Sequence, residues 1–207
     1  MVGAVALSGV AAWSLAPWAR RLVDSDSRWL HSWIPALFGG AGGAGAAAIA
    51  DHWAVALALC ALAVGSALLI PIDLAVFRLP DAIIWPTTSA VAGMLLVAAA
   101  FTGDWARLGT ALLAMLAVGA LYFLLGWFAP RSFGLGDVKL SLVLGLTLGW
   151  YGWHAVLYGM VVGFVLFAVA AIVLLVARRI SMKSDLAFGP WMLFGAAAGV
   201  AWGALNF

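Results

Sequence analysis

The sequence contains no glutamate, and all eight of its acidic residues are aspartates. Charged residues make up only 9% of the chain and hydrophobic residues 67%, whereas a soluble domain is about 25% charged and about 45–50% apolar. The net charge of +2 is too small and too scattered to indicate a nucleic-acid partner. The single cysteine, Cys60, excludes an intramolecular disulfide and a cysteine-rich zinc module. The composition therefore predicts a membrane protein.

Eight apolar stretches are candidates for membrane-spanning helices, which need about 20 mostly apolar residues. They cover residues 2–19, 33–50, 53–75, 87–103, 108–129, 138–153, 155–177 and 186–207. The stretch at 138–153 is short and interrupted by glycines, so its limits are the least defined. There is no visible repeat and no hydrophilic domain. We therefore expect one all-α domain over residues 1–207, a polytopic bundle of about eight transmembrane helices.

Basic residues are distributed unevenly among the loops. Arg20 and Arg21 follow the first apolar stretch, whereas a signal peptide carries its positive charge before the apolar region, so we expect an uncleaved helix. The loops after the first, third, fifth and seventh spans contain Arg20, Arg21, Arg28, Arg78, Arg131, Lys139, Arg178, Arg179 and Lys183. The other loops contain only Arg107. Since Lys and Arg collect in cytoplasmic loops, both termini are predicted to lie outside the cytoplasm.

Three further features have structural interpretations. The glycine-rich run at residues 39–45 predicts tight packing of the second span, because small residues let helix backbones approach closely. Most of the tryptophans lie near predicted span ends, as in an interfacial aromatic belt. His31 is predicted to lie at the opposite membrane face from His52 and His154, so we expect no metal site. The Gly and Ala content, with Arg outnumbering Lys, is typical of a GC-rich bacterial genome. We therefore expect a bacterial protein, which as a multi-pass helical protein would lie in the cytoplasmic (inner) membrane.

Two aspartates lie where an apolar stretch meets a short polar loop. Asp73 is at the end of the third span and Asp137 is at the start of the sixth, so the charge alternation places both at the cytoplasmic face. A carboxylate at the centre of a membrane helix costs roughly 2.5–3.5 kcal/mol on insertion scales, and less near the ends, so those retained usually have a function. Two neighbouring carboxyls cannot both ionise easily. The two aspartates are therefore candidates for a proton-sharing pair.

The loop before Asp137 contains Gly134 and Gly136. These glycines permit backbone angles closed to other residues, and they leave space beside Asp137 for an extended substrate. A plainer interpretation is a helix-entry turn in which Asp137 is the N-cap of the sixth span. The two interpretations are compatible.

Three short elements occur in order along the chain. The first is Asp73 followed by Arg78-Leu79-Pro80-Asp81, and the second is Gly134-Leu135-Gly136-Asp137 followed by Val138-Lys139. The third is Phe188-Gly189-Pro190, before the last helix. Together, from about the third span to the eighth, they resemble the prepilin peptidases, membrane aspartic proteases of the type IV leader peptidase group. The resemblance implies that Asp73 and Asp137 are catalytic, that no cofactor is used, and that the substrates are prepilin-like membrane proteins cleaved at the cytoplasmic face.

The residues beside the aspartates have both functional and structural interpretations. Asp81 either positions substrate or is simply solvated in the loop after Pro80. Arg78 either binds substrate or lipid headgroups or acts only as a topology determinant. Lys139 either holds the Asp137 loop or extends to the membrane interface. The family resemblance described above implies that Pro190 shapes the start of the last helix. A proline that breaks a helix near a site has the same purely structural interpretation.

One family element is missing. Many bacterial members carry a cytoplasmic insertion after the first span, with paired Cys-x-x-Cys zinc ligands, and also methylate the new N-terminus. The corresponding loop here, residues 20–32, contains no cysteine. The resemblance therefore extends to the peptidase activity but not to the zinc site or the methyltransferase activity, as in the short members that serve Tad/Flp-type pili.

Other classes of function remain open. A proton-coupled transporter would also use intramembrane carboxylates, but it predicts acids near mid-membrane and often an internal repeat. A presenilin-like protease would place its aspartates deeper in the membrane, and a non-catalytic scaffold would tolerate the loss of both. The sequence identifies neither the particular substrate nor the oligomeric state.

Overall fold

The computed structural model describes residues 2–24, 31, 33–129, 134–179 and 186–206. Over these residues the chain forms helices and no strand. The helices are α1 (Val2–Val23), α2 (Trp33–Ile49), α3 (Trp53–Val76), α4 (Asp81–Thr102), α5 (Trp105–Phe128), α6 (Leu135–Trp150), α7 (Trp153–Val176) and α8 (Gly189–Asn206). Five of them, α1, α3, α4, α5 and α7, are long and apolar enough to cross a membrane. The prediction of an all-α, multi-pass membrane protein is confirmed.

Two helix starts differ from the prediction in ways that affect the candidate site. Helix α4 begins at Asp81 rather than at residue 87, because Pro80 provides an extended N-cap and Pro86 is accommodated inside the helix. Helix α6 begins at Leu135 rather than at residue 138, with Gly134 as its N-cap. Asp81 and Asp137 therefore both lie in the first turn of a helix, and neither lies in a loop.

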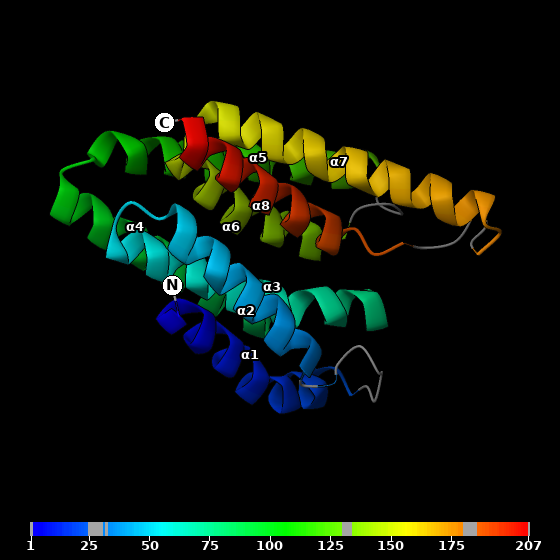
Figure 1. The fold of residues 1–207 in the computed structure, drawn as a ribbon. Helices are drawn as coiled ribbons and strands as arrows, with labels where there is room; N and C mark the ends of the chain where they lie inside the picture. The colour runs from blue at the N-terminus through cyan, green and yellow to red at the C-terminus, as the bar shows by residue number, and fades with distance from the viewer. Residues whose placement is uncertain (1, 25–30, 32, 130–133, 180–185, 207) are drawn as a thin grey trace.

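Helices α3 and α6 form the centre of the bundle. Of the 24 residues of α3, 14 are buried, and of the 16 residues of α6, 10 are buried, compared with 4 of 24 in α7. Helix α3 packs against α1, α2, α4 and α8, and α6 packs against α4, α5, α7 and α8. Figure 1 shows α1 and α7 on opposite sides of the bundle. The two helices that carry Asp73 and Asp137 are thus the most enclosed.

Small residues set the spacing of the first helices. A Cβ added at Gly43 of α2 would lie 2.5 Å from the carbonyl oxygen of Ala4, and one added at Gly39 would lie 2.6 Å from that of Ser8. On another face of α2, a Cβ at Gly42 would lie 2.6 Å from the Cβ of Ala63 in α3. The predicted tight packing of this glycine-rich helix is confirmed, since Gly39, Gly42 and Gly43 leave no room for a side chain against α1 or α3.

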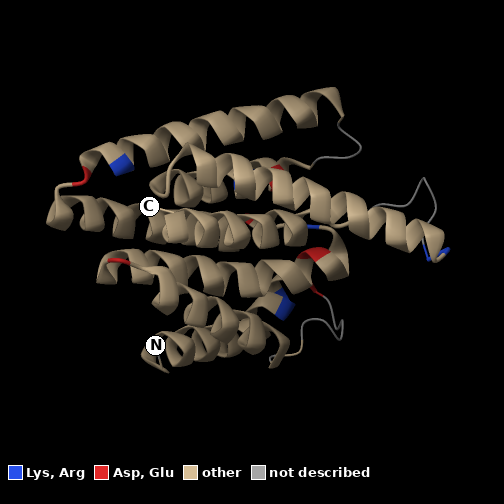
Figure 2. Cartoon of the chain, turned by 45° about the horizontal axis from the view of Figure 1, so that its top comes forward, with Lys and Arg blue, Asp and Glu red and all other residues tan. Residues whose placement is uncertain are grey.

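An ion cluster joins three inter-helix connections at one end of the bundle. The Arg107 Nη1 atom lies 2.7 Å from Asp51 and 3.8 Å from Asp104, and Nε donates to the Trp150 carbonyl oxygen at 3.2 Å. The guanidinium also stacks 4.8 Å from the centre of the Trp150 ring. Most of the basic ribbon segments lie toward the other end (Figure 2). The one basic residue assigned to the non-cytoplasmic loops is therefore paired with two carboxylates.

We expect Gly43→Ala to lower the stability of the bundle by about 1–3 kcal/mol, the usual effect of overpacking, because its methyl group would meet the α1 backbone. Gly45→Ala is the matched control on the same helix. A Cβ at Gly45 meets no atom within 4 Å. That variant should be neutral or slightly stabilising, since alanine favours the helix. Thermal unfolding in detergent measures both, and equal midpoints would contradict the tight α1–α2 contact.

Candidate functional site

Asp73 lies in the last turn of α3 with a buried side chain, 5% exposed. The helix ends just after it, because Phe77 adopts a left-handed backbone conformation (φ 52°) and donates its N–H to the Asp73 carbonyl oxygen. The Asp73 carboxylate accepts a 3.0 Å hydrogen bond from the backbone N–H of Gly189. Gly189 is the first residue of α8, so the carboxylate sits at the positive end of a helix dipole.

The Phe188-Gly189-Pro190 element leaves this N–H available for Asp73. The Phe188 carbonyl oxygen accepts from the N–H groups of Trp191 and Met192 at 3.1 and 3.2 Å, which starts the helix. Pro190 has no N–H and suits the first turn of a helix. A Cβ added at Gly189 would lie 2.8 Å from the Asp73 Oδ2 atom, so a side chain at position 189 would displace the carboxylate.

Aromatic rings hold this element against the second half of the bundle. The Phe188 ring centroid lies 5.4 Å from that of Phe164 and 4.9 Å from that of Phe167, both on α7. It also lies 6.1 Å from the ring of Tyr122 on α5. The residue just before Gly189 is thus fixed by two helices, which in turn fixes the position of the Gly189 N–H.

Asp137 lies in the first turn of α6 and caps that helix. Its Oδ2 atom accepts from the backbone N–H of Gly134 at 3.0 Å, one half of a capping box. The predicted helix-entry turn is therefore present, but the interpretation of Asp137 as its N-cap is wrong, because the N-cap is Gly134 and Asp137 is the N3 residue. Gly134 has φ −87° and ψ 160°, which any residue adopts, so the expectation that it needs backbone angles closed to other residues is wrong. A Cβ there would meet only ordinary contacts, the nearest at 3.7 Å.

Leu79 brings the three sequence elements together. A Cβ added at Gly136 would lie 3.0 Å from the Leu79 Cβ, and one added at Gly189 would lie 3.3 Å from the Leu79 Cδ2. Leu79 itself is buried. Sequence reasoning missed this role, although Leu79 stands within the element that follows Asp73. Gly136 and Gly189 thus allow the loops to close around one leucine.

The two aspartates share this site. Leu79 lies against Gly189, which donates to Asp73, and against Gly136, which precedes Asp137, so the two acids lie on either side of one buried side chain. Both carboxylates accept a backbone N–H at or near the start of a helix, and each lies near the end of a central helix. The structure thus brings together two acids that are far apart in sequence. Their arrangement suits proton exchange within a pair.

An ion pair links the starts of α4 and α6 beside the acids. The Lys139 ammonium lies 2.7 Å from both carboxylate oxygens of Asp81. Asp81 is therefore neither in a loop nor simply solvated, although it is half exposed. Lys139 contacts this aspartate rather than acting only at the membrane interface. Arg78 is exposed, and Pro80 is the N-cap of α4.

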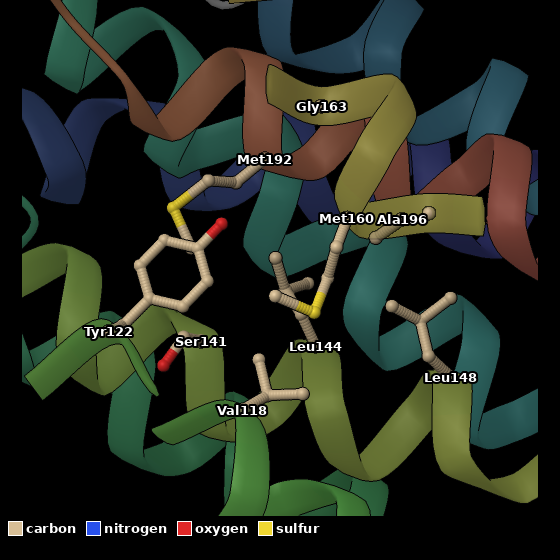
Figure 3. A pocket seen from close by; sticks show the side chains of 10 residues that line it. Val118, Tyr122, Ser141, Leu144, Leu148, Met160, Gly163, Met192 and Ala196 are labelled. Carbon is tan, nitrogen blue, oxygen red and sulfur yellow. The ribbon is translucent and has the colours of Figure 1, made fainter. Parts of the chain in front are cut away.

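A narrow cavity lies between α5, α6, α7 and α8. It is lined by Tyr122, Ser141, Met160 and Met192 among others (Figure 3), and its volume is about 10 Å³. A space of this size holds at most about one water molecule. The Ser141 hydroxyl donates to the Val138 carbonyl oxygen at 2.7 Å. Among the described residues, no three His, Cys, Asp or Glu side chains cluster as metal ligands would.

The described residues thus form a bundle of apolar helices with two aspartates at the ends of its two central helices, α3 and α6. The chain matches the model of the type IV leader peptidase family over residues 60–177, more than half of its length. It therefore belongs to the type IV leader peptidase family, and the predicted resemblance to that family is confirmed. No curated protein and no solved structure is significantly similar to the chain.

We expect Gly189→Ala to reduce peptidase activity by about 100-fold, the scale associated with a displacement of about 1 Å at a catalytic site. The added methyl group would lie 2.8 Å from the Asp73 carboxylate. Gly134→Ala, where the nearest contact is 3.7 Å, is the matched control and should retain activity within about twofold. Leader cleavage followed by mass spectrometry measures both. Similar losses of activity in the two variants would show that peptidase activity does not depend specifically on the Asp73–Gly189 contact.

Removing the Asp81–Lys139 pair should reduce activity by up to about fivefold, because partly exposed ion pairs contribute about 0.2–1 kcal/mol. We expect this loss in Asp81→Asn and in Lys139→Met. The double exchange Asp81→Lys with Lys139→Asp should recover activity, since it restores the link between α4 and α6. A purely local role for either residue would leave the double variant at least as impaired as the single ones.

Proposed function

We propose that this protein is an aspartic endopeptidase that removes the N-terminal leader of prepilin-like membrane proteins at the cytoplasmic face of the bacterial cytoplasmic membrane. Membership of the type IV leader peptidase family supports the reaction class. The observation that supports the aspartic mechanism is that the Asp73 and Asp137 carboxylates accept backbone N–H groups at the starts of α8 and α6, around the same buried Leu79. The substrate partner is then a single-span membrane protein, and no cofactor is needed.

In this mechanism the two carboxyls share one proton. The ionised carboxylate takes a proton from a water molecule as the water oxygen attacks the scissile carbonyl carbon, and the protonated carboxyl gives its proton to the carbonyl oxygen. As the tetrahedral intermediate collapses, one carboxyl gives its proton to the amine nitrogen and the C–N bond breaks. The other carboxylate takes a proton from a hydroxyl of the intermediate, so the products are a carboxylic acid and an amine and the pair again holds one proton. The backbone N–H groups of Gly134 and Gly189 stabilise the negative charge on the acids. Apparent pKa values belong to the pair and are not assigned to either residue.

The position of the acids supports cleavage at the cytoplasmic face. Asp73 is in the last turn of α3 and Asp137 is in the first turn of α6, so both lie toward the end of the bundle where α1 and α7 end near Arg20 and Arg179. The distribution of basic residues assigns that end to the cytoplasm. A leader in the cytoplasm would then reach the acids while the apolar part of the substrate remains in the bilayer.

The cysteine-free connection after α1 supports a short, single-function peptidase, such as those that serve Tad/Flp-type pili. A proton-coupled transporter, the alternative that the sequence left open, is less well supported. Its carboxylates would be needed near the middle of the membrane. Asp73 and Asp137 both lie within one turn of a helix end.

We expect Asp73→Asn and Asp137→Asn each to reduce leader cleavage by about 10²–10⁴-fold, the scale of general acid–base catalysis, while membrane insertion is unchanged. Asp104→Asn, which removes an exposed carboxyl at the other end of the bundle, is the control and should retain activity. Each variant is co-expressed with candidate prepilins, and the mass of the substrate N-terminus is measured. Cleavage at the wild-type rate in either active-site variant would rule out the proposed pair, and the same masses report the cleavage site and any methylation.

A further inference from the structure

An open apolar groove of about 360 Å³ lies between α2 and α8, with α3 as its floor. These three helices lie side by side, as Figure 1 shows and their mutual contacts confirm. Gly45 and Ala46 form part of the α2 wall, Ile70 belongs to the floor, and Leu193 and Ala197 belong to the α8 wall. The groove is far larger than the single-water cavity between α5 and α8, so it can take part of another chain.

One end of the groove lies about one helical turn from the candidate active site. Ile70 precedes Asp73 by about one turn on α3, and Leu193 follows Gly189 by about one turn on α8. The groove therefore shares two of its three helices with the Asp73–Gly189 hydrogen bond. A chain that leaves the groove at this end would need to extend by about one turn of α3 to reach the level of Asp73.

The lining suits an apolar helix. The hydroxyl of Ser66, which lies on the floor, already donates to the Leu62 carbonyl oxygen at 2.7 Å and offers no donor to a polar ligand. The walls are rich in glycine and alanine, which allow a helix backbone to approach closely. Along α3 the groove runs from Leu59 to Ile70, which is about 17 Å or three turns at 1.5 Å per residue.

Two aromatic side chains bridge the walls. Phe38 on α2 and Phe194 on α8 both line the groove, and their ring centroids are 6.4 Å apart. Phe194 follows Leu193 directly, so this contact lies toward the active-site end. The contact between Phe38 and Phe194 narrows this end of the groove. In the proposal, the bound helix would end here and continue as the extended segment that is cleaved.

We propose that the groove binds the first three turns of the substrate's transmembrane helix, immediately C-terminal to the scissile bond. The proposal rests on the proposed function and adds the surface that recognises the substrate. The position of the groove one helical turn from Asp73, its apolar lining and its small-residue walls favour a transmembrane peptide helix as the occupant. The leader, on the other side of the scissile bond, would lie outside the groove.

Gly45→Leu tests the groove by filling it. A Cβ at this position meets no atom within 4 Å, so the leucine side chain extends into open space and the helix loses a glycine. We expect kcat/KM for a full-length prepilin to fall by about tenfold or more. Gly93→Leu on α4 is the matched control, because its Cβ also meets nothing within 4 Å and it does not line the groove. It should remain within about twofold of wild type.

Cysteine cross-linking identifies the occupant. The buried Cys60 is first replaced by serine. Two single-cysteine variants are then made in this background, Ala197→Cys on the groove wall and Ala168→Cys at an exposed position of α7, and their cross-linking to substrate is compared. A prepilin with single cysteines along its apolar helix should cross-link to position 197 with a helical period of about 3.6 residues, and not to position 168.

The outcomes separate this proposal from the proposed function. If the wild-type protein cleaves no prepilin, the proposed function fails. If it cleaves normally and Gly45→Leu does so too, or if position 197 cross-links only to a second copy of this chain, the groove proposal is wrong while the function stands. The groove proposal is equally wrong if Gly45→Leu only displaces a copurifying lipid and leaves cleavage unchanged.

Discussion

The hydrogen bond from the Gly189 N–H to the Asp73 carboxylate is the interaction on which the rest of the site depends. It joins the end of α3 to the start of α8 across most of the chain, at a distance of 3.0 Å. A buried carboxylate is costly without such partners. The start of α8 provides an unpaired N–H and a favourable dipole, and Asp137 receives a similar N–H from Gly134. Two acids are thereby retained at the ends of central membrane helices.

Close packing makes this hydrogen bond possible. Gly189 has no side chain to push the carboxylate away, Gly136 lets Leu79 approach, and the ring of Phe188 anchors the start of α8 against α7. The pair formed by Lys139 and Asp81 then ties α6 to α4. Each of these contacts joins helices from different parts of the chain. The positions of the two carboxylates therefore depend on the packing of the whole bundle.

The central helices connect the two proposals. Helix α3 contains Asp73 near its end and forms the floor of the apolar groove from Leu59 to Ile70, and α8 contains both Gly189 and one groove wall. In the proposed function, the catalytic acids and the surface that binds the substrate helix would therefore share these two helices.

The sequence alone determined the number and order of the helices, because hydrophobic length and the alternation of basic loops are local properties of the chain. It also singled out Asp73 and Asp137, since acids at span ends are rare and their neighbouring motifs resemble one family. Only the tertiary structure decided what surrounds them. The roles of Leu79, of the Gly189 N–H and of the Asp81–Lys139 pair depend on contacts between distant segments. The helix starts at Asp81 and Leu135 also depended on the folded chain, because caps and packing override the hydrophobic pattern at helix ends.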